Sequence, residues 1–308
     1  MGKVSKDKRD IYYRKAKEEG WRARSAFKLI QVDEAFDILS GVKNVVDLCA
    51  APGSWSQVLS RRLYLPAVAN GVPETELPKI VAVDLQPMAP LEGVVQIQGD
   101  ITSVATVDKM IGHFNGEHAD LIVSDGAPDV TGLHDMDEFV QSQLILAGLT
   151  VVISALRPGG AFVAKVFRGK DIGLLYAQLK IFFPKVHIAK PKSSRNSSIE
   201  AFVVCQDYSP PPGLSQDAMR ALLDQRSEAL TGGDLEAKSN SYVESTLVPF
   251  LACGDLSGYD ADQSYPLSVA HGDSEYVTIA PVQAPIAPPY KTAIAMEKDK
   301  QNLRTKHG

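Results

Sequence analysis

Four charged residues, Lys28, Asp125, Lys165 and Glu200, stand where a buried cluster could do acid–base chemistry. Lys165 is the most unusual, because it interrupts the apolar run 161–167, which is typical of an interior strand. A charge in such a strand is costly to bury unless it is paired or neutralised. Asp125 ends one predicted strand and Glu200 begins another, so we interpret the four side chains together.

Two lysines and two carboxylates suit the deprotonation of a weak nucleophile such as a ribose hydroxyl. Methyl transfer to that hydroxyl needs a base and a positive field for the developing alkoxide. A lysine whose pKa is depressed by burial and by a second ammonium can be the base, so we expect Lys165 to act in this way. Lys28 would supply the second charge and help hold the target nucleotide, and Asp125 would orient Lys165. Glu200 would bond the substrate ribose or Lys165. The alternative is a buried ion-pair network that only holds strands together.

The segment 45–55 predicts a ligand-binding turn between a buried strand and a helix. Small residues there let the backbone approach a ligand, and Gly53 tolerates backbone angles that other residues avoid. The turn lacks the G-x-G-x-x-G pattern and a P-loop lysine, so a ligand without phosphates at this point is favoured over a dinucleotide.

Acidic residues lie at the C-terminal ends of three successive predicted strands: Asp84, Asp100 and Asp125. The carboxyl ends of parallel strands meet at one crevice, so we expect these side chains to converge. Asp84 could accept hydrogen bonds from the ribose hydroxyls of an adenosine-containing ligand, and Asp100 could bind its adenine amino group. An acid at such a position is, taken alone, more often a helix cap or a loop residue, but the shared position of the three favours a nucleoside site.

The elements that must position these residues alternate between short apolar runs and helical patterns from residue 44 to 208. This alternation predicts an α/β fold with a seven-stranded, mostly parallel sheet and helices on both faces. The expected strands are 45–49, 80–85, 94–98, 121–124, 161–167, 186–188 and 201–205. Apolar residues at helical spacing predict a helix over 137–156 that stops at the following Arg-Pro-Gly-Gly. Residues 65–78 carry three prolines and are interpreted as a surface insertion without chemistry.

Composition indicates a globular protein with one large core, since 44% of the 308 residues are hydrophobic. The three cysteines lack the paired spacing of a zinc site or a disulfide framework, so we predict no metal. No apolar run is long enough to span a bilayer, and the charged N-terminus does not resemble a signal peptide. We therefore expect no membrane association and a location in the cytosol or nucleus.

The net charge of −5 hides two basic clusters. Residues 1–28 hold ten Lys or Arg against four Asp or Glu, and a second cluster at 185–195 lies among serines. Two such patches indicate a polyanionic partner, with solvated surface charge as the alternative. The candidate RNA contacts are Arg22, Arg24, Lys28, Lys190, Lys192 and Arg195.

A proline-rich break at 210–213 divides the chain into a domain over 1–208 and an extension over 209–308. Residues 215–230 are predicted to form an amphipathic helix. The remainder is expected to be disordered or ordered only on a partner, and we hypothesise that it docks an auxiliary subunit.

In these residues and their spacing, the sequence resembles the FtsJ-like family of RNA ribose 2′-O-methyltransferases. The matching stretches are 13–28, 47–55, 124–128 and 157–167, within residues 1–208. The resemblance implies a Rossmann-like class I methyltransferase fold and S-adenosylmethionine as methyl donor. It implies that the family's Lys-Asp-Lys-Glu tetrad falls on Lys28, Asp125, Lys165 and Glu200. The implied donor contacts are Gly53, Trp55, Asp84, Asp100 and Asp125.

Within the family, the resemblance is strongest to eukaryotic cytoplasmic enzymes that methylate tRNA anticodon loops at positions 32 and 34. Two tail segments, 248–260 and 285–290, support this choice, whereas the 65–78 insertion departs from compact members. The resemblance implies a tRNA substrate, a cytoplasmic location and auxiliary proteins that select the loop position. Two alternatives remain: an rRNA ribose 2′-O-methyltransferase, and a non-catalytic relative that binds RNA or serves as a scaffold.

Overall fold

The computed structural model describes residues 10–127, 134–168, 172–210, 250–255, 257–266 and 279–280. Its centre is one sheet of eight strands in the order β3-β2-β1-β4-β5-β7-β6-β8. The strands are β1 (Asn44–Leu48), β2 (Lys79–Asp84), β3 (Val94–Gln98), β4 (Ala119–Ser124), β5 (Leu156–Phe167), β6 (Lys185–Pro191), β7 (Glu200–Gln206) and β8 (Phe250–Cys253). The predicted α/β fold is confirmed, and every one of the seven predicted strands is present.

The sheet is parallel from β3 through β5, and β7 runs antiparallel between β5 and β6. Every residue of β1 is buried, as expected for a strand covered on both faces. Strand β5 begins earlier than predicted, at Leu156 instead of Ala161. Residues 157–160 form an irregularity against β4, where the register shifts between Ala119 and Leu121. The Arg-Pro-Gly-Gly segment, which was predicted to end the preceding helix, is therefore part of β5 and forms a bulge there.

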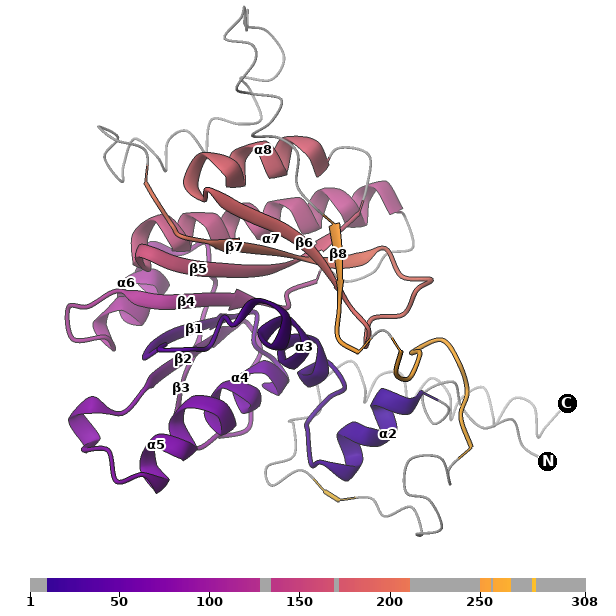
Figure 1. Cartoon of the computed structure of the whole chain (residues 1–308). Coiled ribbons are helices and arrows are strands. Elements are labelled where there is room, and N and C mark those ends of the chain that lie inside the picture. The colour runs from indigo at the N-terminus through magenta and orange to yellow at the C-terminus, as the bar shows by residue number, and fades with distance from the viewer. Residues whose placement is uncertain are drawn as a thin grey trace, which may run out of the picture.

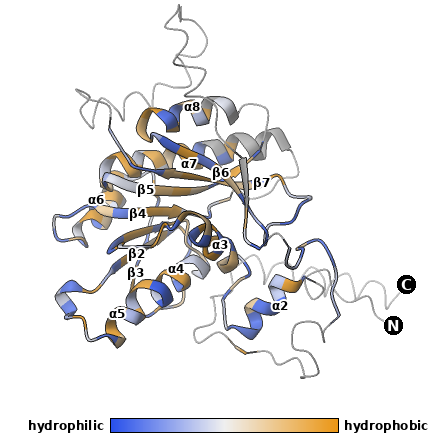
Figure 2. Cartoon of the chain, viewed as in Figure 1, coloured by the Kyte–Doolittle hydropathy of each residue, from blue (hydrophilic) through white to orange (hydrophobic). Residues whose placement is uncertain are grey.

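Helices cover both faces of the sheet and enclose two hydrophobic cores (Figure 1). The helices are α2 (Ile11–Glu18), α3 (Ala26–Phe36), α4 (Ser54–Leu59), the π-helix η1 (Ser60–Tyr64), α5 (Leu65–Ala69), the 3-10 helix η2 (Glu74–Glu76), α6 (Val104–Gly112), α7 (His134–Ala155) and α8 (Ile172–Phe182). One core packs α6, α7 and α8 on the sheet, and the other packs α2, α3 and α4 on its opposite face. Figure 2 shows that the central strands between these layers are mostly hydrophobic.

The segment 65–78 lies at the surface, as predicted. It continues the chain beyond α4 and η1 as α5 and η2, neither of which contains a buried residue. No helix in the described ranges is long and apolar enough to cross a membrane.

The C-terminal extension contributes the eighth strand, which the sequence analysis did not predict. Strand β8 pairs in parallel with β6, from Ile188 with Phe250 to Pro191 with Cys253. The predicted helix 215–230 lies outside the described residues.

Candidate active site

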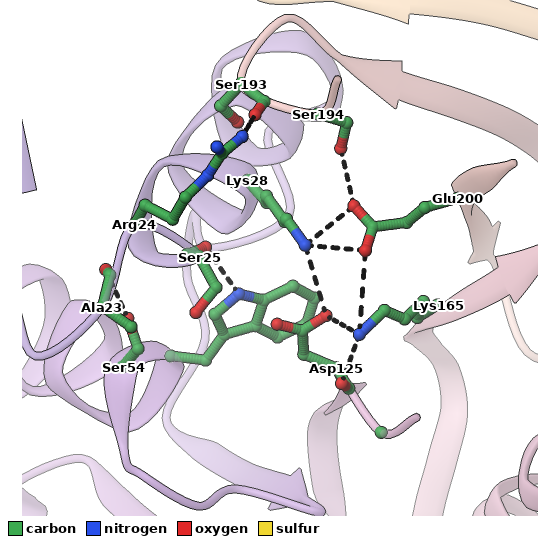
Figure 3. A network of polar contacts seen from close by, with 12 residues as sticks. Ala23, Arg24, Ser25, Lys28, Ser54, Asp125, Lys165, Ser193, Ser194 and Glu200 are labelled. Atoms are coloured by element: carbon green, nitrogen blue, oxygen red, sulfur yellow. Dashed lines mark hydrogen bonds and ion pairs between the residues drawn. The ribbon is translucent and has the colours of Figure 1, made fainter. Parts of the chain in front are cut away.

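Four charged side chains meet at the carboxyl edge of the central strands (Figure 3). Lys28 comes from α3, Asp125 directly follows β4, Lys165 lies in β5 and Glu200 begins β7. Strand β5 pairs in parallel with β4 and antiparallel with β7, with Phe167 opposite Glu200. Because β7 runs antiparallel, its first residue lies at the edge where β4 and β5 end. The topology thus brings together the four residues that the sequence analysis grouped.

The cluster is a network of two cations and two carboxylates. Lys165 Nζ lies 2.8 Å from Asp125 Oδ1, donates a 2.8 Å hydrogen bond to the Asp125 carbonyl and lies 3.8 Å from Glu200 Oε2. Lys28 Nζ lies 2.7 Å from Glu200 Oε1, donates to Glu200 Oε2 at 2.8 Å and lies 4.0 Å from Asp125 Oδ1. Each carboxylate therefore lies within 4.0 Å of both ammonium groups, and the formal charges cancel.

The pKa of Lys165 differs in direction from the prediction. Burial lowers this pKa, but the carboxylates of Asp125 and Glu200 outweigh burial and hold it above its ordinary value. The prediction of a depressed pKa for Lys165 was wrong, because each ammonium group has a carboxylate partner. Lys28 bonds Glu200, and Lys165 bonds Asp125. Burial raises the pKa of Glu200, but Lys28 and Lys165 together lower it to well below its usual range.

Two further polar residues hold the cluster, and the sequence analysis missed both. Gln141, on α7 and only 2% exposed, donates through Nε2 to the carbonyls of Lys165 at 2.8 Å and Gly126 at 3.1 Å. Ser194, 3% exposed, donates through Oγ to Glu200 Oε1 at 2.8 Å. Gln141 stands beside Ser142 and Gln143 in the sequence, so its residue type alone carried no signal for this position. Ser194 is one of several serines beside the second basic cluster, and its residue type gave no signal for a bond to Glu200.

The turn between β1 and α4 has the tight geometry that the sequence analysis expected. Gly53 has φ +94°, and its N–H donates to the Ala50 carbonyl at 2.6 Å. The positive φ favours glycine, and a Cβ on Gly53 would lie 2.5 Å from Arg22 Nη1, so the guanidinium would have to move away from the carbonyls that it bonds. Asp84, at the end of β2, accepts the Ala51 N–H at 2.8 Å through Oδ2 and fixes the turn from the other side.

The three acids that follow β2, β3 and β4 are at the same edge of the sheet, as predicted. Asp100 accepts from the Thr102 N–H and hydroxyl through Oδ1, both at 2.8 Å, and is exposed. Asp84 also accepts the Gln86 N–H at 2.7 Å. At this edge a turn without a phosphate-binding motif lies beside carboxylates that accept hydrogen bonds. Such acceptors fit the hydroxyl and amino groups of a nucleoside such as that of S-adenosylmethionine.

Trp55 lies beneath the turn and is buried. Its indole N–H donates to the Ser25 carbonyl at 2.9 Å, and its ring packs against Phe202 at 5.5 Å between centroids. The structure thus places Trp55 as a support that ties α4 to α3 and to the sheet. Its indole N–H is therefore already bonded to a backbone carbonyl of the protein.

Two of the predicted RNA contacts are buried against backbone carbonyls. Arg22 is 5% exposed and donates to the carbonyls of Pro52 at 3.1 Å and Pro90 at 2.8 Å, where it supports the ligand-binding turn. Lys190 is 8% exposed and donates to the carbonyls of Ser198 at 2.6 Å and Glu200 at 2.8 Å. These bonds place both cations differently from the predicted phosphate contacts, because their donors face the interior.

Other predicted RNA contacts gather around one buried carboxylate. Asp10 caps α2, accepting the Tyr12 N–H at 3.0 Å, and forms ion pairs with Arg24 and with Arg195 at 3.3 Å. Arg24 also donates to the Ser193 carbonyl. Arg24 of the N-terminal cluster and Arg195 of the 185–195 cluster therefore meet at Asp10, and we call the surface around them the basic face. Lys192 on this face is partly exposed, whereas Lys28 contacts Glu200.

Cys49, Cys205 and Cys253 are free thiols in the structure. Among the described residues there is no group of three or more His, Cys, Asp or Glu side chains that could hold a metal ion.

Comparison with known proteins agrees with this geometry. The family model described as FtsJ-like methyltransferase matches residues 21–208. A mouse tRNA (cytidine(32)/guanosine(34)-2′-O)-methyltransferase is 56% identical over 98% of this chain and 88% of its own length. The Schizosaccharomyces pombe protein of the same name is 53% identical over 97% of this chain and 99% of its own length.

More distant relatives match a smaller part of this chain. An AdoMet-dependent rRNA methyltransferase of Candida albicans is 40% identical over 78% of this chain but only 27% of its own length. A crystal structure of a ribosomal RNA methyltransferase from Plasmodium falciparum superposes with a TM-score of 0.53 at 28% identity, covering 62% of this chain and all of that one. From the tetrad geometry and these matches, the chain belongs to the FtsJ-like methyltransferase family.

Proposed function

We propose that this protein transfers a methyl group from S-adenosylmethionine to ribose 2′-hydroxyls of tRNA, at anticodon-loop positions 32 and 34, with Lys165 as the general base. The observation that carries the proposal is the position of Lys165 Nζ, 2.8 Å from Asp125 Oδ1 and 3.8 Å from Glu200 Oε2, beside the ligand-binding turn. The names of relatives at 56% and 53% identity supply the substrate class.

The methyl donor supplies an electrophilic methyl group on a sulfonium. The residues of this chain that would hold the donor are the 49–54 turn, with Gly53, and the acids Asp84, Asp100 and Asp125. Trp55 supports them from beneath, since its indole is buried and bonded to Ser25. These roles for the acids and the turn rest on their shared edge of the sheet and on the family resemblance.

Lys165 must be neutral to accept a proton from the ribose hydroxyl. Its raised pKa means that the free protein holds Lys165 as an ammonium. A cationic donor beside Asp125 would offset the carboxylate that raises this pKa, and so would favour the neutral amine when the site is filled. Lys28, which Glu200 holds at 2.7 Å, would keep a fixed positive charge near the developing alkoxide.

The basic face around Asp10 is the part of the surface that we expect to contact the tRNA backbone. Arg24, Arg195 and Lys192 are its candidates, because their side chains are partly exposed. Arg22 and Lys190 support the site from within. The auxiliary subunits that select the loop position, and a cytoplasmic location, are further predictions from the family resemblance.

Incubation of the purified chain with labelled S-adenosylmethionine and RNA tests the proposal. Total tRNA and rRNA are offered separately, with and without extract from a strain that lacks the gene, and methylated riboses are mapped. Lys165→Ala should abolish labelling at anticodon-loop riboses, while the exposed Lys109→Ala on α6 should retain it. Label confined to rRNA would favour the rRNA alternative. An absence of label with donor binding retained would favour a non-catalytic protein.

A further inference from the structure

A segment of the C-terminal extension lies against the catalytic domain, beside the tetrad. We define residues 250–255 and 257–266 as the strap (Figure 1, orange). Its strand β8 pairs with β6, and the Cys253 carbonyl accepts the Lys192 N–H at 2.7 Å just beyond that pairing. Further along, Arg14 donates to the carbonyls of Tyr265 at 3.0 Å and Pro266 at 3.3 Å. The strap is thus attached to both β6 and α2.

The strap also holds the loop between β6 and β7, residues 192–199, which we call the tetrad loop. Asp262 Oδ2 accepts the backbone N–H groups of Asn196 and Ser197, the second at 3.3 Å, and Oδ1 accepts the Ser197 hydroxyl at 3.3 Å. Asp260 Oδ2 accepts the Asn196 side-chain amide at 3.2 Å. Two strap carboxylates therefore fix the tip of the tetrad loop.

Residues on both sides of this tip bond Glu200. Ser194 Oγ donates to Glu200 Oε1 at 2.8 Å, and Ser198 Oγ accepts the Glu200 N–H at 3.1 Å. Glu200 in turn holds Lys28 at 2.7 Å and lies 3.8 Å from Lys165. A continuous series of contacts leads from Asp262 through the tetrad loop to the proposed base.

We propose that the strap is a positioning element for the tetrad, and that Asp262 acts on Glu200 through the tetrad loop and Ser194. The inference rests on the proposed function of the tetrad. Ordering a loop costs backbone entropy, and hydrogen bonds from N–H groups to a carboxylate offset that cost. Without Asp262 the loop samples other conformations, so Ser194 leaves Glu200 and the tetrad loses its fixed geometry.

The test compares variants of the full chain on tRNA under saturating donor. Asp262→Ala should lower kcat about tenfold with KM for tRNA changed less than about twofold, because positioning acts on the chemical step. Asp262→Asn keeps an oxygen acceptor and should recover most of the loss. The matched control is Asp255→Ala, which removes a strap carboxylate that bonds Ser257 at 3.0 Å and 2.6 Å within its own turn, and kcat should stay unchanged.

A double-mutant cycle separates positioning from general destabilisation. If Asp262 acts through Ser194, the Asp262→Ala/Ser194→Ala protein should be no slower than Ser194→Ala alone. Additive losses would overturn the route through Ser194. A normal kcat for folded Asp262→Ala would overturn the positioning role. If KM for tRNA rose at that normal kcat, the loop would instead bind RNA.

Two further outcomes keep the test decisive. If Asp262→Ala does not fold, Ser194→Ala carries the test, and an unchanged kcat for that variant would leave the strap without a route to Glu200. Lys165→Ala is measured beside these variants. A wild-type rate for Lys165→Ala would refute the proposed function itself, whereas its loss with a normal Asp262→Ala would refute only the strap inference.

Discussion

Replacement of Glu200 by Gln removes one carboxylate from a buried network of four charges. Glu200 Oε1 lies 2.7 Å from Lys28 Nζ, and Glu200 Oε2 lies 3.8 Å from Lys165 Nζ. Against the effect of burial, these two ammonium groups lower the pKa of Glu200 from an ordinary 4.5 to about 2. A difference of about 2.5 pKa units corresponds to about 3 kcal/mol of stability at neutral pH. Removal of one partner from a buried ion pair costs a similar roughly 3–5 kcal/mol. We therefore expect Glu200→Gln to unfold with a free energy about 3 kcal/mol lower at pH 7.

The sign of the pH dependence makes this prediction specific. The pKa of Glu200 is depressed in the folded state, so its contribution is complete above about pH 4.5 and is lost as pH falls toward about 2. Urea unfolding of wild type and Glu200→Gln at pH 7, 5, 4 and 3 measures the difference directly. The difference in unfolding free energy between the two proteins should shrink steadily below pH 4.5, because protonation of Glu200 removes its contribution in the wild type. Carboxylates that both proteins share cancel in this difference.

The exposed Glu76→Gln on η2 is the matched control and should show no gap at any pH. A gap for Glu200→Gln that stays the same from pH 7 to pH 3 would refute the reasoning. So would equal stability of the two proteins at pH 7, since the ammonium groups would then contribute nothing through Glu200.

Three other substitutions test separate parts of the account. Gln141→Leu removes two hydrogen bonds to backbone carbonyls around Lys165, so unfolding by urea should show a loss of about 1–3 kcal/mol, and an unchanged midpoint would contradict the supporting role. Gly53→Ala places a side chain at φ +94° and 2.5 Å from Arg22 Nη1, so calorimetry should show donor binding at least about tenfold weaker. Wild-type donor affinity would contradict the argument that the turn must approach the ligand closely. Burial raises the pKa of Asp47 to about 7, so its ionisation opposes folding at higher pH and Asp47→Asn should be more stable than wild type at pH 8 but not at pH 4. A thermal shift in the opposite direction at pH 8 would show that the charged form is stabilised.

Much of the fold and the identity of the tetrad could be predicted from the sequence. Interior parallel strands such as β1, β2 and β4 are buried on both faces and leave continuous apolar runs in the sequence. All seven strands that were predicted from apolar runs are present. A lysine inside one of these runs needs a partner, which made Lys165 conspicuous and linked it to Asp125 and Glu200. Strand β8 was missed, because four residues paired at the sheet edge carry little periodic signal.

The details that depend on three-dimensional pairing could not be predicted from residue types. The direction of the Lys165 pKa shift depends on which carboxylate each ammonium contacts, and two lysines in a sequence do not reveal that. Arg22 and Lys190 belong to basic clusters in the sequence, but their donors face backbone carbonyls in the structure. Ser194 is one of several serines in its loop, and only the fold places its hydroxyl on Glu200.

The central claim is that Lys165 removes the proton from the ribose hydroxyl, and Lys165→Arg tests it most directly. Arginine keeps the positive charge beside Asp125 but does not give up its proton in proteins. Single-turnover methyl transfer to tRNA is measured from pH 6 to pH 10 with saturating donor. The wild-type rate should rise with pH, and Lys165→Arg should be slower by about 10²–10⁴-fold with donor affinity preserved. A Lys165→Arg protein with a wild-type rate and pH profile would contradict the claim, because charge alone would then suffice.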